Sequence, residues 1–272
     1  SYKNAAPLFN DALKFRGFNN YIEIMSQYWL AECYYRLNKY HSALNILREL
    51  QSDSSFKKSN KYADSFFDSG YCLFKEGAYS KALVEFTLYL KYKEITEAES
   101  STGRGAECAL RIADCYYHSG EYEKAATIYE KRAIADLYSD PHIPFQAAIS
   151  YGMAGFAEKK QALLYEILDK GKSNSPYYSN AAYELGLQLI QTSKSDEAEE
   201  VFKTLAKGED TTFRYKALFN LGTINLNRQN YNSALKFYKM VVSQNPGSKE
   251  ASDALSGVEN IYQIIGKGEE FN

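Results

Sequence analysis

Residues 63–92 read ADSFFDSGYCLFKEGAYSKALVEFTLYLKY and contain two apolar stripes of helical period on either side of a short turn. The turn is Glu76-Gly77-Ala78, and Gly77 stands where the end of a helix favours a left-handed residue. The segment therefore predicts a helical hairpin, with a first helix over 63–75 and a second helix over 80–92.

The same hairpin recurs along the chain. A small residue stands twelve positions before a recurring alanine, and a large apolar or aromatic residue usually stands four positions after it. Small residues at both places let the two helices of a hairpin approach closely. Glu166 breaks the pattern in one copy, which we expect to be degenerate and shifted in register. The recurring alanines, 36–43 residues apart, are Ala5, Ala43, Ala82, Ala125, Ala162, Ala198 and Ala234.

Several of these positions resemble the tetratricopeptide repeat, in particular Leu185-Gly186, Leu221-Gly222, the pair Ala198 and Phe202, and Pro246. The units are longer than usual and are similar to those of bacterial arrays with lengthened repeats. The resemblance implies an all-α fold, an α-solenoid with a right-handed superhelix. We expect about six full hairpins, a leading half-repeat and a C-terminal helix, which gives about fourteen helices.

The domain organisation follows from this repeat. Each unit of a solenoid contacts its neighbours, so residues 1–272 are predicted to form a single solenoid. The repeat is least regular at 138–176, where we expect a junction. Because the pattern begins in the middle of a repeat, we expect this chain to be an excerpt of a longer one.

Composition makes catalysis and metal binding poor expectations. The net charge is −2, without the basic excess typical of nucleic-acid binding, and no apolar run is long enough to span a membrane. The three histidines are scattered, and three of the four cysteines, Cys33, Cys72 and Cys115, share one repeat position that suits a buried small residue. We therefore expect no catalytic residues, no metal and no cofactor.

The unusual feature is an aromatic excess of 25 Tyr and 15 Phe with a single Trp. The resemblance implies that the first helix of each hairpin lines a concave groove, at positions 15, 11, 8 and 7 before the recurring alanine. Tyr and Phe give a large contact area at low entropic cost, which suits an extended peptide or a partner helix. The candidate partner-binding residues are Tyr28, Tyr35, Arg36, Phe67, Tyr71, Phe74, Lys75, Tyr117, Tyr151 and Tyr183.

An alternative for these rings is packing against the adjacent hairpin. At positions 15 and 11 before the alanine we expect exposed rings, and at position 8 the two interpretations stay open. Some family members hold a C-terminal carboxylate with Lys, Asn and Arg. Here Glu32 and Tyr71 stand where Asn would be needed, so we do not expect that mode of recognition.

The functional hypothesis is a non-enzymatic scaffold that binds a protein or peptide, in the manner of bacterial cell-envelope assembly proteins. The compartment is open, with the periplasm or outer membrane favoured over the cytoplasm. Exposed terminal helices would also allow self-association. The alternative is a targeting or regulatory arm of a longer enzyme, and a less favoured one is an active site around 145–170, which would need clustered carboxylates.

Overall fold

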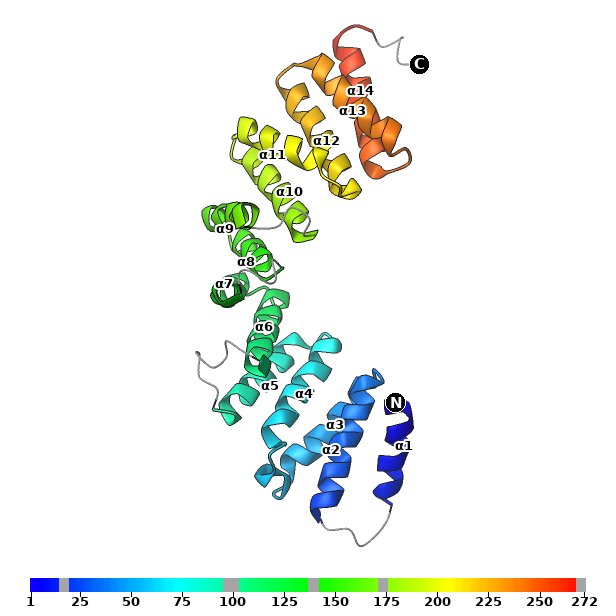
Figure 1. Ribbon diagram of the computed structural model, residues 1–272, viewed down its shortest axis with the longest axis vertical. Coiled ribbons are helices and arrows are strands. Elements are labelled where there is room, and N and C mark those ends of the chain that lie inside the picture. The colour runs from blue at the N-terminus through cyan, green and yellow to red at the C-terminus, as the bar shows by residue number, and fades with distance from the viewer. Residues whose placement is uncertain (15–19, 95–102, 137–141, 171–175, 268–272) are drawn as a thin grey trace. The chain divides into compact units, whose positions relative to one another are not determined.

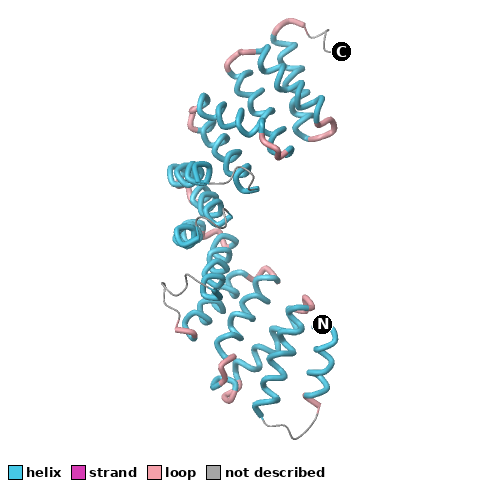
Figure 2. The backbone as a smooth tube through the Cα atoms, viewed as in Figure 1, coloured by secondary structure: helices cyan, strands magenta, loops and turns pink. Residues whose placement is uncertain are grey.

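The computed structural model describes residues 1–14, 20–94, 103–136, 142–170 and 176–267. Within these ranges it contains fourteen α-helices, one short 3-10 helix and no strand (Figures 1 and 2). The all-α class and the expected number of helices are therefore confirmed. The twelve helices α2 to α13 follow one another as first and second helices of six hairpins, with α1 packed before the first hairpin and α14 packed after the last.

The chain divides into two compact units. The N-terminal unit comprises Ser1–Asp136 with Ile149–Gly155. Its helices are α1 (Tyr2–Ala12), α2 (Asn20–Arg36), α3 (Tyr40–Ser52), α4 (Tyr62–Lys75), α5 (Tyr79–Tyr92), α6 (Gly103–His118) and α7 (Tyr122–Asp136), with the 3-10 helix at Phe56–Lys58.

The C-terminal unit comprises Leu137–Ala148 with Phe156–Asn272. The division passes through its first helix, inside the irregular segment predicted at 138–176, of which 138–141 and 171–175 lie outside the described residues. One solenoid over 1–272 stays a prediction. Its helices begin with the first part of α8 (His142–Met153), whose residues from Ile149 onward belong to the N-terminal unit. The others are α9 (Ala157–Lys170), α10 (Pro176–Gln191), α11 (Ser195–Lys207), α12 (Thr211–Asn227), α13 (Tyr231–Gln244) and α14 (Lys249–Ile264).

A left-handed residue ends the first helix of every hairpin. Gly77 has a φ of 76°, as its position in the sequence predicted, and Asn38 adopts the same conformation at 59°. Such a conformation has no steric cost for glycine and a small one for asparagine. The backbone N–H of Gly77 and of Ala78 donates to carbonyls of the last turn of α4, which closes the helix.

The close approach of paired helices rests on glycine facing an aromatic ring. A Cβ atom on Gly70 would lie 2.7 Å from the ring of Phe86, and one on Gly186 would lie 2.5 Å from the ring of Phe202. Both rings are fully buried. In the first full hairpin the same two positions hold Ala31 and Leu47. Alanine is larger than glycine and leucine is smaller than phenylalanine, so the two changes compensate in volume.

The fourth full hairpin, α8 and α9, has a register different from the one suggested by Ala162. In the other five hairpins the recurring alanine is the fourth residue of the second helix, five residues after the left-handed turn residue. In α9 the fourth residue is Lys160, five residues after Gly155. Ala162 is exposed, whereas Ala148 and Leu164, twelve before and four after Lys160, are fully buried. The repeat is therefore shifted by two residues here.

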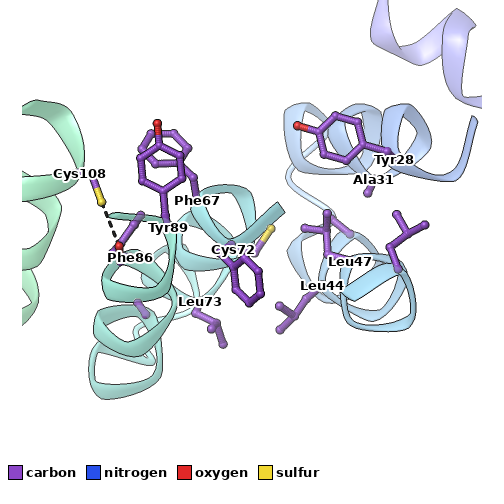
Figure 3. Close-up of a cluster of buried hydrophobic side chains, with 14 of the residues drawn as sticks. Tyr28, Ala31, Leu44, Leu47, Phe67, Cys72, Leu73, Phe86, Tyr89 and Cys108 are labelled. Atoms are coloured by element: carbon purple, nitrogen blue, oxygen red, sulfur yellow. Dashed lines mark hydrogen bonds between the residues drawn. The ribbon is translucent and has the colours of Figure 1, made fainter. Parts of the chain in front are cut away.

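The core of the N-terminal unit runs between hairpins rather than around one centre (Figure 3). Tyr28 and Leu47 of the first hairpin join Phe67 and Phe86 of the second in one buried cluster. All four cysteines are buried and free, as the shared repeat position predicted for three of them. The Cys108 thiol donates to the Phe86 carbonyl at 3.3 Å and so links α6 to α5.

Candidate functional site

One stripe runs along each first helix of the N-terminal unit, at alternating spacings of three and four residues, which keep it on one side of a helix. The stripes lie on neighbouring helices and are joined by contacts between side chains, and we call them together the first-helix face. Its members are Ile22, Met25, Trp29, Glu32 and Arg36 on α2; Lys61, Asp64, Asp68, Tyr71 and Lys75 at α4; and Arg104, Glu107, Arg111, Asp114 and His118 on α6.

Tyrosine hydroxyls connect successive first helices across this face. The Tyr28 hydroxyl of α2 donates to the Asp68 carboxylate of α4 at 2.7 Å. One hairpin further along, the Tyr71 hydroxyl of α4 donates to the Glu107 carboxylate of α6. Each bond holds a tyrosine ring in place beside a carboxylate, so this part of the face is ordered before any ligand binds.

The Asp68 carboxyl titrates near neutrality. Burial raises its pKa to about 7, and the Tyr28 hydroxyl and the Arg104 guanidinium offset only part of that effect, while Glu32 and Asp64 add to it. The Tyr28 pKa is raised as well, first by burial and then by the neighbouring Asp68 charge. Both groups therefore keep their protons to a higher pH than an exposed Asp and Tyr would.

Asp64 has the opposite environment, because three cations surround its carboxylate. Lys61 Nζ lies 3.1 Å, Lys93 Nζ 3.0 Å and Arg104 Nη1 3.4 Å from its oxygens. Burial alone would raise the pKa of Asp64, but the hydrogen bonds from Lys93 and Lys61 hold it below its usual value. The carboxylate is 5% exposed, and the three cations are each partly open to solvent.

The expectation that rings at positions 15 and 11 are exposed is wrong for Tyr28 and Phe67, which are buried. The Phe67 ring packs 4.9 Å from the Tyr71 ring, and the Arg104 guanidinium of the next hairpin covers it at 5.1 Å. Lys61 covers Tyr28 in the same way, at 5.8 Å. These rings pack against the adjacent hairpin because that hairpin places a cation over each.

The rings at position 8 have a different role within their own hairpin. Tyr35, Phe74 and Tyr117 are half-buried. Each contacts the tyrosine that opens the following helix, at ring-centroid distances of 5.8 Å, 5.3 Å and 5.4 Å respectively. They therefore pack at the hairpin turn and are not members of the first-helix face.

The remaining candidates fall in different places. Arg36 and Lys75 are exposed at the end of the first-helix face, and Arg36 pairs with Glu32 at 2.8 Å. Tyr183 is half-buried in the C-terminal unit. Tyr151 is buried and donates to Glu130 of α7, so its assignment to the groove is wrong. The two-residue shift at Lys160 explains the error, since it removes Tyr151 from position 11.

Sequence reasoning missed the residues that give the face its charge, namely Lys61, Asp64, Asp68 and Arg104. They lie 14, 18 and 21 positions before the recurring alanines, outside the positions that the family resemblance implied. Their alternating three and four spacing along α4 and α6 is visible in the sequence and would have identified them.

The parts of the chain that the structure describes contain neither a metal-binding cluster nor a membrane-spanning helix. No group of three or more His, Cys, Asp or Glu side chains there could hold a metal ion. Among the described helices, none combines the length and the apolar character that a membrane crossing needs.

The repeat matches a known protein family. Sequence profiles of the tetratricopeptide repeat match residues 25–54, 107–131 and 183–249. A comparison with curated protein sequences gives no match. The matched segments overlap four of the six hairpins, and the hairpin with Lys160 in place of alanine is not among them.

Solved structures share the fold at low sequence identity. The C-terminal part of a tetratricopeptide repeat-containing protein from Cytophaga hutchinsonii has a TM-score of 0.69 at 18% identity, covering 93% of this chain and 94% of that one. A tetratricopeptide repeat protein from Parabacteroides merdae has a TM-score of 0.58 at 16% identity, covering 77% and 75%.

A third structure, YrrB, is described as a tetratricopeptide repeat protein with an unusual peptide-binding site. Its TM-score is 0.53 at 16% identity, covering 74% of this chain and 96% of that one. The matching profiles and the shared folds indicate the same family as the recurrent hairpins and their glycine-to-aromatic packing. The chain is a tetratricopeptide repeat protein.

Proposed function

We propose that this chain binds a peptide or a partner helix on the first-helix face of its N-terminal unit. The tetratricopeptide repeat fold is a protein-interaction scaffold and is typically non-catalytic.

Two exposed apolar side chains on an ordered, charged face carry the proposal. They are Trp29 and Ile22, which we call the apolar ledge. Trp29 is 41% exposed and Ile22 is 46% exposed, one above the other on α2. The Trp29 ring lies 5.3 Å from the Tyr28 ring, which is already fixed by its hydrogen bond to Asp68 of α4. Exposed large apolar side chains on a pre-ordered surface suit binding, because little entropy is lost when the partner docks.

Two features of other proteins support this choice. YrrB, with the same fold, has a peptide-binding site according to its description. Aromatic residues and arginine are also the residue types most enriched in the energetic centres of protein interfaces, and Trp29 and Arg36 are both on this face.

We further propose a role in cell-envelope assembly, with the protein in the periplasm or at the outer membrane. The support is the similarity to lengthened bacterial repeats, and the Tyr, Asn, Lys and Ser content is compatible with it. Subcellular fractionation of the native organism tests it. Recovery of the protein in the cytoplasmic fraction alone would contradict the proposal.

The test of partner binding places a photo-crosslinking amino acid at position 29. A second variant carries it at Val84, which is 57% exposed on the second helix α5. We expect a defined crosslinked partner from position 29 and none from position 84. Replacing Ile22 by Ser should then abolish the crosslink without changing the circular dichroism spectrum. A partner crosslinked equally at both positions, or at neither, would contradict this location.

A further inference from the structure

The cations around Asp64 leave an excess of positive charge on the first-helix face. Lys61, Lys93 and Arg104 all point at the one buried carboxylate. Asp64 balances one of the three charges, and the Asp68 carboxylate, which interacts with the Arg104 charge, balances a second when it is ionised, so one positive charge remains among these groups. The side chains are 27%, 35% and 49% exposed respectively, so a ligand can reach them.

Aromatic rings partly shield two of these cations, Lys61 and Arg104, from water. The Lys61 ammonium lies 5.6 Å from the Trp29 ring and 5.8 Å from the Tyr28 ring, and the Arg104 guanidinium lies 5.1 Å from the Phe67 ring. A cation held against a ring and a carboxylate has little freedom to lose. An anion that binds there therefore gains charge-assisted hydrogen bonds at low entropic cost.

The apolar ledge lies directly beside this cationic cluster. Lys61 contacts Trp29, and Ile22 stands seven residues before Trp29 on the same side of α2. A ligand bound across both would present a negative group to the cations and an apolar group to the ledge. Two such groups a few residues apart are a feature of acidic peptide segments that contain large apolar side chains.

We propose that the partner contributes an internal acidic segment, with Asp or Glu side chains on Lys61, Lys93 and Arg104 and an adjacent apolar side chain on Trp29 and Ile22. This inference rests on the proposed function and names the chemistry of the partner. A nucleic acid fits less well, because the chain as a whole has a net charge of −2 and lacks the basic excess typical of nucleic-acid binding.

The single tryptophan of the chain makes the site measurable, since Trp29 reports binding by its own fluorescence. The probe is the peptide Asp-Glu-Leu-Phe-Glu-Asp, acetylated and amidated so that no terminal carboxylate takes part. The matched control replaces each Asp by Asn and each Glu by Gln. We expect the acidic peptide to bind at least about tenfold more tightly, with a preference that weakens as salt is raised.

Three variants locate the charge. Lys93→Gln leaves Lys61 and Arg104 to pair Asp64 and should weaken the acidic peptide by about threefold to tenfold. Asp64→Asn removes the carboxylate that all three cations contact and should strengthen binding of the acidic peptide. Lys81→Gln, an exposed lysine on the second helix α5, should leave binding unchanged. Thermal unfolding monitored by circular dichroism shows whether each variant is folded.

The outcomes separate this inference from the proposed function. Equal binding of acidic and neutral peptides, or weaker binding after Asp64→Asn in a folded protein, overturns the acidic chemistry while leaving the site at Trp29 in place. Tighter binding of a thymidine 20-mer or of phosphatidylserine vesicles than of the acidic peptide also overturns it. If neither peptide binds, the inference fails, and the crosslink from position 29 alone decides the proposed function.

Discussion

The two units use a tyrosine at the same repeat position but give it different partners. In the N-terminal unit the Tyr28 hydroxyl donates to Asp68 of the next hairpin. In the C-terminal unit burial raises the pKa of Tyr183, and the Asn220 amide of the next hairpin lowers it in part. Asp68 and Asn220 occupy the same repeat position. The packing of the repeat is thus common to both units, while its electrostatics differ.

The shared packing gives the largest expected effect. Gly70→Ala and Gly186→Ala should each destabilise the protein by about 1–3 kcal/mol, because the new methyl group meets a fully buried ring. The gain of about 0.5–1 kcal/mol in helix propensity from glycine to alanine does not offset this. Urea denaturation followed by circular dichroism measures both losses.

A second substitution sharpens this test. Gly186→Ala combined with Phe202→Leu recreates the Ala31 and Leu47 pairing of the first full hairpin. The double variant should therefore lose less stability than the sum of the losses in the two single variants. Ser256→Ala, at an exposed position of α14, is the control and should change stability by less than about 0.5 kcal/mol. Additive losses would show that the ring and the glycine are not packed against each other.

Because the two units differ at this position, exchanging the residues should change the pH dependence of stability in opposite directions. Since Asp68 has a pKa of about 7 when folded and 3.8 as its ordinary value, the unfolded chain loses this proton first. Stability from this group therefore falls as pH rises from about 4 to 7 and is level above that. Asp68→Asn should remove the fall. Relative to the wild type, the variant should be more stable by about 1–2 kcal/mol at pH 8 than at pH 5, a discounted value because Asp68 is only partly buried.

The reverse exchange tests the same idea in the other unit. Asn220→Asp should introduce a fall in stability over the same pH range, since the position is buried. Urea midpoints between pH 5 and 8 give both curves. Parallel curves for the wild type and Asp68→Asn would mean that Asp68 titrates as an ordinary surface carboxyl.

The smallest effect is expected at the shifted hairpin. Lys160 occupies the place of the recurring alanine and pairs with Glu184 at 2.8 Å, with side chains 19% and 31% exposed. Lys160→Ala loses a partly exposed ion pair worth about 0–1 kcal/mol and gains the residue that the repeat favours. We expect a net change within about 0.5 kcal/mol by thermal unfolding. A loss above about 2 kcal/mol would mean that the ion pair, rather than the register, holds this hairpin.

The sequence predicts the hairpins well because their determinants are local. Gly77 and Asn38 mark the turns, and Gly70 faces Phe86 only sixteen residues away. The first-helix face is harder to predict because each of its contacts joins two hairpins. Tyr28 contacts Asp68, forty residues away, and no spacing within one repeat reveals that partner.

The two failures of prediction have separate physical causes. Tyr151 was misplaced because a single substitution, Lys160 for alanine, hides the anchor of its hairpin, and Ala162 offers a false one. Phe67 was expected to be exposed because the ring at that position faces the groove in the family. Here Arg104 from the next hairpin lies over it.

The distribution of the cysteines allows opening of the N-terminal unit to be measured separately. All four cysteines lie in the N-terminal unit, and burial raises the pKa of Cys72, Cys108 and Cys115 to about 12. A thiol in this state reacts with an alkylating reagent only when its hairpin opens. The rate of labelling therefore measures the opening of the N-terminal unit alone, one hairpin at a time, in the unmodified protein.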